Sequence, residues 1–303
     1  MRNTPEPAAR RGVLSRMAAP LVSVVIPTFD RADLLVEAVR SVIVQTVTDW
    51  ELIVADDGSG DDSAARIAAL GDPRIRFLAG EHRGSPGIAR NRGAAAAAGP
   101  WLAFLDSDDL WLPDRLAAQL AAVARDRAAW CYADHGLIDA AGAFVPKRAG
   151  GFAPQAGDIL LPLIREETSA SVSTLLVRRA LFVALGGFDE TLRYRPDLDL
   201  AFRLAAAAEA AVVDAPLAMI REHAGRLTRG VTDPHARTML VFERLEQRAP
   251  GADAVAAARI RKRALGHAGA RFALRKGRPL EAARLWLRGR RDLTPPADPR
   301  SSR

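Results

Sequence analysis

The sequence has a single cysteine, Cys131, among 303 residues. An internal disulfide is therefore impossible, and a cysteine-rich zinc site is excluded. The sequence also lacks any run of about 18 uninterrupted apolar residues, so we expect no transmembrane helix. Residues 1–20 are basic and rich in proline and alanine, but they have no apolar stretch typical of a signal peptide. We therefore expect residues 1–20 to be a disordered tail and the protein to be cytoplasmic.

The formal net charge of +7 is distributed unevenly. Residues 1–20 carry four basic and one acidic side chain, residues 21–233 carry 22 basic and 29 acidic, and residues 234–303 carry 17 basic and six acidic. Because few aromatic side chains accompany the last group of arginines, we expect no nucleic-acid binding. Two interpretations remain for residues 234–303: a solvated helix surface, or peripheral contact with an anionic membrane at its inner face.

Strand-like and helix-like patterns alternate from residue 21 onward. Apolar, β-branched runs predict strands at 21–27, 50–59, 74–79, 101–105, 128–134 and 171–179. Apolar residues at helical spacing predict helices at 32–46, 61–70, 87–98, from about 113, 180–188 and 196–210. This alternation predicts an α/β fold with a mostly parallel sheet flanked by helices.

Two segments depart from the alternation. Residues 136–170 show no regular pattern, and residues 234–303 are helical only. We therefore expect three parts: the tail at 1–20, an α/β domain at 21–233, and a basic helical C-terminal segment at 234–303.

Acidic residues gather where predicted strands end. These residues are Asp30 after the first strand, Asp56 and Asp57 after the second, and Asp106, Asp108 and Asp109 after the fourth. The carboxyl ends of parallel strands meet at one edge of a sheet, so we expect one acidic crevice. Like charges this close repel each other, so we expect a bound cation. Two carboxylates spaced as Asp-x-Asp suit Mg²⁺ or Mn²⁺ carrying a phosphate ligand.

The acidic segment alone is compatible with other chemistries. An aspartyl-phosphate phosphatase usually has Gly-Thr where this sequence has Asp109 and Leu110. An EF-hand needs further oxygen ligands and a glycine where the sequence has apolar residues 110–112. A receiver domain needs a lysine, and Lys147 is the only one between residues 21 and 233. For Asp109 we predict a simpler role, as the cap of the helix that starts near Pro113.

Three stretches together resemble an inverting family 2 glycosyltransferase of the GT-A (Rossmann-like) fold. They are VSVVIPTFDRADLLVEAVRSVIVQTVTDWELIVADDGSGDDS, GIARNRGAAAAAGPWLAFLDSDDLWLPDRL and GGFDETLRYRPDLDLAFRL, in this order within residues 21–223. The resemblance implies transfer of a sugar from a nucleoside-diphosphate donor, typically a UDP-sugar, with Mn²⁺ or Mg²⁺ as cofactor. The implied acceptor is the hydroxyl of a glycan or a lipid-linked intermediate in cell-surface polysaccharide assembly. A Gln-x-x-Arg-Trp segment, typical of processive synthases, is absent, so we expect one or a few additions.

The resemblance also implies roles for individual residues. Those implied to contact the donor are Pro27, Thr28, Phe29, Asp30, Asp56, Asp57, Arg83, Arg90, Asn91, Asp106 and Ser107. Those implied to hold the metal are Asp108, Asp106 and His223. Asp197 matches the catalytic base, although Pro196 replaces the glutamate that usually precedes it. Without the resemblance, Asp197 could simply interact with backbone amides at a helix start.

Two other functions remain open. The same carboxylates could serve a metal-dependent phosphohydrolase or nucleotidyltransferase. Alternatively, the protein could be a non-catalytic nucleotide-sugar-binding module, for which Pro196 is the only hint. Several further residues have more than one interpretation: Ser171, Ser173 and Thr174 as packing or acceptor contacts, Trp111 as core or cleft wall, and His82, His135, His235 and His267 as surface or structural residues.

Overall fold

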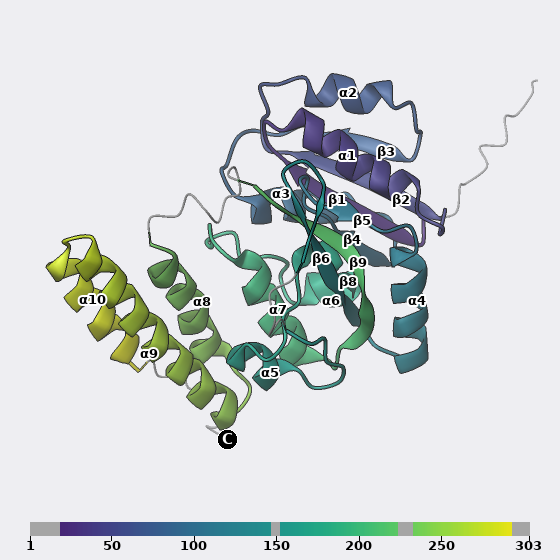
Figure 1. Ribbon diagram of the computed structural model, residues 1–303. Helices are drawn as coiled ribbons and strands as arrows, with labels where there is room; N and C mark the ends of the chain where they lie inside the picture. Colours follow the sequence, from purple (N-terminus) through teal and green to yellow (C-terminus); the bar gives the residue numbers. More distant parts are fainter. Residues whose placement is uncertain (1–18, 147–151, 224–232, 293–303) are drawn as a thin grey trace, which may run out of the picture.

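The computed structural model describes residues 19–146, 152–223 and 233–292 (Figure 1). In chain order its elements are β1 (Val22–Thr28), α1 (Ala32–Ile43), β2 (Trp50–Asp56), α2 (Ser63–Ala69), β3 (Ile75–Leu78), α3 (Pro86–Ala95), β4 (Trp101–Phe104), β5 (Leu110–Trp111), α4 (Arg115–Asp126), β6 (Trp130–Asp139), β7 (Phe144–Val145), α5 (Leu160–Arg165), a 3₁₀ turn η1 (Val172–Thr174), β8 (Leu176–Arg178), α6 (Arg179–Ala184), α7 (Pro196–Ala207), β9 (Ala211–Glu222), α8 (Pro234–Arg248), α9 (Ala252–Arg275) and α10 (Pro279–Arg290). Most of the predicted tail, residues 1–18, lies outside the described residues.

One nine-stranded sheet organises the fold, and the predicted α/β class is confirmed. The strand order is β3-β2-β1-β4-β8-β6-β9-β5, and β7 pairs with β6. Neighbours among β1 to β4 are parallel, as is the pair β6–β9. Strands β8, β5 and β7 join antiparallel. The predicted parallel arrangement therefore holds for β3-β2-β1-β4 and for the pair β6–β9, and the antiparallel strands β8, β5 and β7 complete the sheet.

β1 shows how the sequence builds this sheet. Val22, Val24 and Ile26 pack on one face, against apolar side chains that include Leu35 of α1. Val25 packs on the other face, because successive side chains of a strand point to opposite sides. All these side chains are fully buried. A β-branched run without polar alternation fits a parallel strand covered by helices on both faces.

The C-terminal helices pack closely on the α/β body (Figure 1). α8 lies between α7 and the α9–α10 pair, and the Phe242 ring of α8 packs 5.4 Å from that of Phe202 in α7. Ala254 and Ala258 of α9 belong to the same apolar cluster as the sheet. The C-terminal helices therefore share an apolar cluster with the α/β body. Among the described residues, no helix is long and apolar enough to span a membrane.

Several elements were missed by the sequence patterns. The twelve-residue strand β9 is interrupted in sequence by Asp214 and Pro216, and its pairing with β6 shifts register near Asp134. Such an irregularity hides the alternation that predicts a strand. α5 and the short strands β5 and β7 were also missed. The strand predicted at 171–179 divides into η1 and β8, and Leu110–Trp111 pair with β9 before α4 begins at Arg115.

Candidate active site

The carboxyl ends of β1, β2 and β4 meet at one cavity of about 260 Å³. The start of α7 and the loop before α3 also contribute to its walls. The predicted site residues that line it are Pro27, Thr28, Phe29, Asp57, Arg90, Asp106, Ser107, Asp108 and Asp197. The structure therefore brings together residues that are up to 170 positions apart in the sequence, counted from Pro27 to Asp197.

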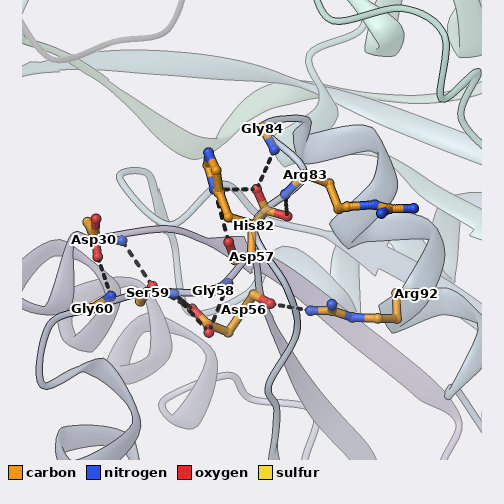
Figure 2. Close-up of polar contacts among 10 residues, drawn as sticks. All are labelled: Asp30, Asp56, Asp57, Gly58, Ser59, Gly60, His82, Arg83, Gly84 and Arg92. Atoms are coloured by element: carbon orange, nitrogen blue, oxygen red, sulfur yellow. Dashed lines mark hydrogen bonds and ion pairs between the residues drawn. The ribbon is translucent and has the colours of Figure 1, made fainter.

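Asp57 connects the end of β2 with the loop that precedes α3 (Figure 2). Its carboxylate accepts hydrogen bonds from the backbone amides of Arg83 (3.0 Å) and Gly84 (2.9 Å). Nδ1 of His82 lies 3.2 Å from the same carboxylate. Asp57 therefore fixes the 82–84 loop and lines the cavity at the same time.

Phe29 and His82 form an aromatic pair in the cavity wall. Their ring centroids are 4.1 Å apart, and Phe29 remains 37% exposed. Gly58 allows the loop that follows β2 to approach the backbone of His82 closely. Its φ is +82°, and a Cβ at this position would lie 2.6 Å from the backbone nitrogen of His82. A larger residue would therefore strain the backbone and displace His82 from the cavity.

Asp30 and Asp56 hold the loop that follows β2 (Figure 2). The Asp56 carboxylate accepts hydrogen bonds from the amides of Gly58 (3.2 Å) and Ser59 (3.1 Å). Oδ1 of Asp30 accepts from the amide of Gly60 (2.7 Å), while its own amide donates to the hydroxyl of Ser59 (3.0 Å). Neither Asp30 nor Asp56 lines the cavity. Their geometry supports a role in shaping the loop, and the donor contact stays a prediction.

Three carboxylates after β4 form a compact cluster, in which one oxygen of each lies within 4.8 Å of the others: Asp106, Asp108 and Asp109. Asp109 is buried, and its two oxygens accept hydrogen bonds from the Ser173 hydroxyl (2.6 Å) and the Arg221 backbone amide (3.0 Å). The predicted helix-capping role of Asp109 is wrong, because α4 begins only at Arg115. Asp109 instead ties the acidic segment to η1 and β9.

Crowding raises the pKa of two of these carboxyl groups. Burial raises the pKa of Asp106, and the charges of Asp108 and Asp197 raise it further against the opposing effect of Arg90. Burial, with the charges of Asp106 and Asp108, raises the pKa of Asp109 well above its ordinary value. The cluster is therefore short of positive charge when ionised, and a divalent cation there would favour the ionised form of each carboxyl group.

These raised pKa values predict pH-dependent stabilisation by metal. The folded protein holds protons on Asp106 and Asp109 that the unfolded chain has released, so stability without metal falls as pH rises from about 3.8 through the folded pKa values. A bound cation removes this loss. We expect the Tm increase caused by saturating Mn²⁺ to be larger at about pH 7.5 than at about pH 5.5. Thermal unfolding in EDTA and in Mn²⁺ measures it, and an equal increase at both pH values would contradict the prediction.

Asp108 and His223 are in direct contact at the edge of the acidic cluster. Nε2 of His223 lies 2.9 Å from Oδ2 of Asp108. Carboxylate oxygens and an imidazole nitrogen are ligand types that Mn²⁺ accepts. The residues present therefore fit a divalent cation, and Nη1 of Arg31, 2.8 Å from the same oxygen, adds positive charge beside them.

The start of α7 forms another wall of the cavity. Pro196 is its first residue, where a missing N–H costs nothing. Arg195 precedes it with φ of +53°, a left-handed conformation that residues other than glycine rarely adopt. Asp197 follows in the first turn, and its charge contributes to the raised pKa of Asp106, so the two carboxylates face a common space. Arg193 and Arg195 also line the cavity, and neither pairs with a carboxylate within the described part of the chain.

Most of the N-terminal half of the chain matches a known protein family. Residues 23–150 match Glycosyl transferase family 2. These residues form a family 2 glycosyltransferase domain. The family 2 domain supplies the strand ends and the acidic cluster, whereas Asp197 and His223 come from the chain beyond it.

One curated relative of the family 2 domain is the Escherichia coli UDP-Glc:alpha-D-GlcNAc-diphosphoundecaprenol beta-1,3-glucosyltransferase WfgD. The two are 32% identical over 119 residues, which is 39% of this chain and 47% of WfgD. The chain spans less than half the length of WfgD and only 28% of the next relative, the Rhizobium meliloti succinoglycan biosynthesis protein ExoO.

Solved structures confirm the predicted GT-A fold. Staphylococcus aureus TarS 1–349 in complex with UDP-GlcNAc aligns with a TM-score of 0.68 and 19% identity, over 88% of this chain and 79% of that one. The Pyrobaculum calidifontis mannosyltransferase PcManGT, in complex with GDP-Man and Mn²⁺, aligns with a TM-score of 0.61 and 18% identity, over 89% and 74%. Sequence identity this low supports the fold alone.

Asn91 and Arg83 lie beside the cavity without lining it. The Asn91 amide group donates to the carbonyl of Phe188 (2.9 Å) and accepts from its N–H (2.8 Å), which fixes the turn that leads to α7. Arg83 contributes its backbone amide to Asp57, while its side chain is exposed. The geometry of both residues supports positioning of neighbouring loops, and their donor contact stays a prediction.

Sequence reasoning missed three residues in or beside the cavity. Arg31 follows the first strand end, the same signal that identified Asp30, but it was overlooked. His82 was interpreted as a surface or structural residue, although it follows the third predicted strand. Ser173 was expected on a strand face but lies in η1, where its hydroxyl accepts from the Asp106 amide (3.1 Å) and donates to Asp109. No local pattern predicts that pairing.

The structure also locates Trp111, Ser171 and Thr174, for which the sequence left two interpretations. Trp111 is buried in the core beside β4 and α4, and its indole N–H donates to the carbonyl of Ser173 (2.9 Å). Ser171 lines the cavity, whereas the Thr174 hydroxyl donates back to the Ser171 carbonyl (2.8 Å). Trp111 is therefore a core residue that supports η1.

Proposed function

We propose that the protein transfers a sugar from a UDP-sugar to an acceptor hydroxyl, with inversion at the anomeric carbon. The observation that carries this proposal is the meeting of three features in one cavity: the Asp57 loop, the Asp106–Asp109 cluster and Asp197. In a nucleoside-diphosphate sugar, the Asp57 loop would bind the nucleoside and the Asp106–Asp109 cluster would hold a cation for the diphosphate. Asp197 would act beside the sugar.

The first part of the proposal concerns the nucleoside. Phe29 offers a partly exposed ring, and Asp57 offers a carboxylate in the same wall. An aromatic face and a hydrogen-bond acceptor suit a planar base such as uracil. Thr28 contributes a hydroxyl oxygen with no hydrogen-bond partner in the described structure, which leaves it able to bind a ligand.

The second part concerns the diphosphate. Asp108, Asp106 and His223 would hold Mn²⁺ or Mg²⁺, which when bound supplies positive charge to the diphosphate as it leaves. Arg90 is buried beside Asp106 and keeps that carboxylate in place. Arg193 and Arg195 line the cavity without carboxylate partners in the described chain, so we assign them to anionic oxygens of the donor or of a phosphorylated acceptor.

The third part is the transfer itself. Asp197 accepts the proton of the acceptor hydroxyl as that oxygen attacks the anomeric carbon. The bond from this carbon to the diphosphate oxygen breaks as the new bond forms on the opposite side, which inverts the carbon. UDP leaves with the electron pair of the broken bond, and the proton stays on Asp197 until solvent removes it.

The comparisons support a donor and acceptor of this class. WfgD is named for UDP-Glc and for an acceptor linked to diphosphoundecaprenol, TarS is solved with UDP-GlcNAc, and PcManGT with GDP-Man and Mn²⁺. We propose a UDP-sugar donor and a lipid-linked or glycan acceptor for this chain, in surface polysaccharide assembly.

The test is incubation with UDP-glucose, UDP-GlcNAc and GDP-mannose in Mn²⁺, with water as a slow substitute acceptor. We expect release of nucleoside diphosphate and free sugar from one donor, and inversion predicts that NMR detects the released sugar first as its β-anomer when the donor is α-linked. Release of inorganic phosphate or of nucleoside monophosphate instead would support a phosphohydrolase or nucleotidyltransferase. Binding of a donor without any turnover, with or without added glycan acceptors, would support a binding module.

A further inference from the structure

The outer face of α10 combines exposed leucines with arginines. Leu280, Arg284 and Leu287 recur at helical spacing, and the exposed fractions of the two leucines are 77% and 61%. Leu285 and Ala282 lie on the opposite side of α10, buried against α8 and α9. We define the outer face by Leu280, Arg284 and Leu287 together with the adjoining pair Trp286 and Arg290.

The basic groups near this face have few acidic partners. Arg278 pairs with Glu281 and Arg288 with Glu243. Over the described part of the chain, Arg275, Lys276, Arg284 and Arg290 form no ion pair. The guanidinium of Arg290 instead lies 3.9 Å from the centre of the exposed Trp286 ring. The turn between α9 and α10 and the outer face of α10 are therefore strongly positive.

The outer face is fixed to the body of the protein. α9 and α10 touch at two glycines, because a Cβ on Gly266 would lie 2.8 Å from the Cα of Gly289. The buried ammonium group of Lys262 in α9 bonds Glu246 of α8 and the backbone carbonyl of Arg291, which follows α10. Figure 1 shows α10 beside α9, on the side away from the sheet. These contacts hold α10 with Leu280 and Leu287 facing away from the core.

We infer that the outer face of α10 binds the surface of an anionic lipid bilayer. Leucine side chains gain by leaving water for the acyl boundary, while arginines on the same face bind lipid phosphates. A tryptophan with an arginine over its ring suits the polar–apolar boundary of a bilayer. The inference is independent of the sugar donor. It assigns part of the positive charge of residues 234–303 to a defined surface, the outer face of α10.

Two other partners fit this face less well. Nucleic acid would satisfy the arginines but leave Leu280 and Leu287 in water, and Trp286 is the only exposed aromatic ring on the face for base stacking. A second copy of the chain, meeting the face symmetrically, would bring two sets of unpaired positive charges together. An anionic bilayer satisfies both the charge and the apolar surface.

Sedimentation with vesicles tests the inference with the full chain. One vesicle preparation contains phosphatidylglycerol and phosphatidylcholine in equal amounts, and the other contains phosphatidylcholine alone. We expect binding to the first only, and weaker binding as salt increases. The double variant Leu280→Ser/Leu287→Ser should bind about tenfold more weakly. Arg284→Gln/Arg290→Gln should weaken binding and reduce its dependence on salt.

A matched double variant controls for the general effect of removing exposed apolar groups. Val44→Ser/Val183→Ser changes two exposed residues of α1's end and α6, away from the outer face, and should bind the anionic vesicles like the parent. Equal sedimentation of the parent with both kinds of vesicle, or unchanged binding by the leucine variant, would overturn the inference. So would tighter binding to duplex DNA than to vesicles, or a solution dimer that the leucine variant dissociates.

Discussion

Asp197→Asn is expected to lower kcat for sugar transfer by about 10²- to 10⁴-fold while leaving nucleotide affinity nearly unchanged. Asparagine keeps the size of the side chain but cannot accept the proton of the attacking hydroxyl. Asp197 lies in the first turn of α7 and makes no ion pair with any residue that the structure describes, so its loss should not disturb the fold. Release of UDP measures kcat, and calorimetry with UDP and Mn²⁺ measures the affinity.

Asp33→Asn is the control for this substitution. The Asp33 carboxylate lies in the first turn of α1, so it has the same relation to its helix as Asp197, but its side chain is 84% exposed. We expect this variant to turn over at the parent rate. If Asp197→Asn kept more than about a tenth of the parent kcat, a different group would have to remove the acceptor proton.

Asp108→Asn is expected to weaken Mn²⁺ binding by about 100-fold or more. Changing a group that only orients a metal ligand costs about 10- to 100-fold in affinity, so removing the charge of a ligand itself should cost at least as much. Asp108 is the carboxylate that His223 and Arg31 approach most closely. Electron paramagnetic resonance of free Mn²⁺ measures the affinity directly, without any need for turnover.

The same control applies to the metal measurement, because Asp33→Asn removes one negative charge from a carboxylate that belongs to neither the cluster nor the cavity lining. It should bind Mn²⁺ like the parent protein. Unchanged Mn²⁺ affinity in Asp108→Asn would mean that the cation binds elsewhere or not at all. In that case Arg90 and Arg31, rather than a cation, would supply the positive charge beside the Asp106–Asp109 cluster.

Strand ends were predictable because their signal is local. Each of β1, β2 and β4 is an apolar run with an acid at its end or within two residues of it, and parallel neighbours must bring those ends together. The positions of Asp57, Asp106 and Asp108 in the cavity follow from this rule. Asp197 needed the resemblance as well, because an acid in the first turn of a helix is common for purely local reasons.

The role of Asp109 was not predictable in the same way. Its partners, the Ser173 hydroxyl and the Arg221 amide, come from η1 and β9, which lie 64 and 112 residues further along the chain. Neither element was predicted as it is: the residues of η1 were part of a predicted strand, and the strand pattern of β9 is broken by Pro216 and Asp214. A single sequence therefore favoured the nearest explanation, a helix cap, over a pairing that only the tertiary fold creates.

The C-terminal helices show what amino-acid composition cannot predict. Their charge was read correctly from composition, but composition cannot tell which side of a helix faces the protein. Lys262, one of the basic residues that suggested a solvated surface, is fully buried against Glu246. The structure shows that Ala282 and Leu285 form the buried side of α10, and therefore that Leu280 and Leu287 are exposed on the other side.

Titration of the protein with UDP, in Mn²⁺ and then in EDTA, tests the central claim that the cavity holds a nucleoside diphosphate through a divalent cation. With Mn²⁺ we predict binding of one UDP per chain, and in EDTA we predict affinity that is at least about tenfold weaker. Equal affinity in the two buffers, or no binding of UDP in Mn²⁺, would contradict it.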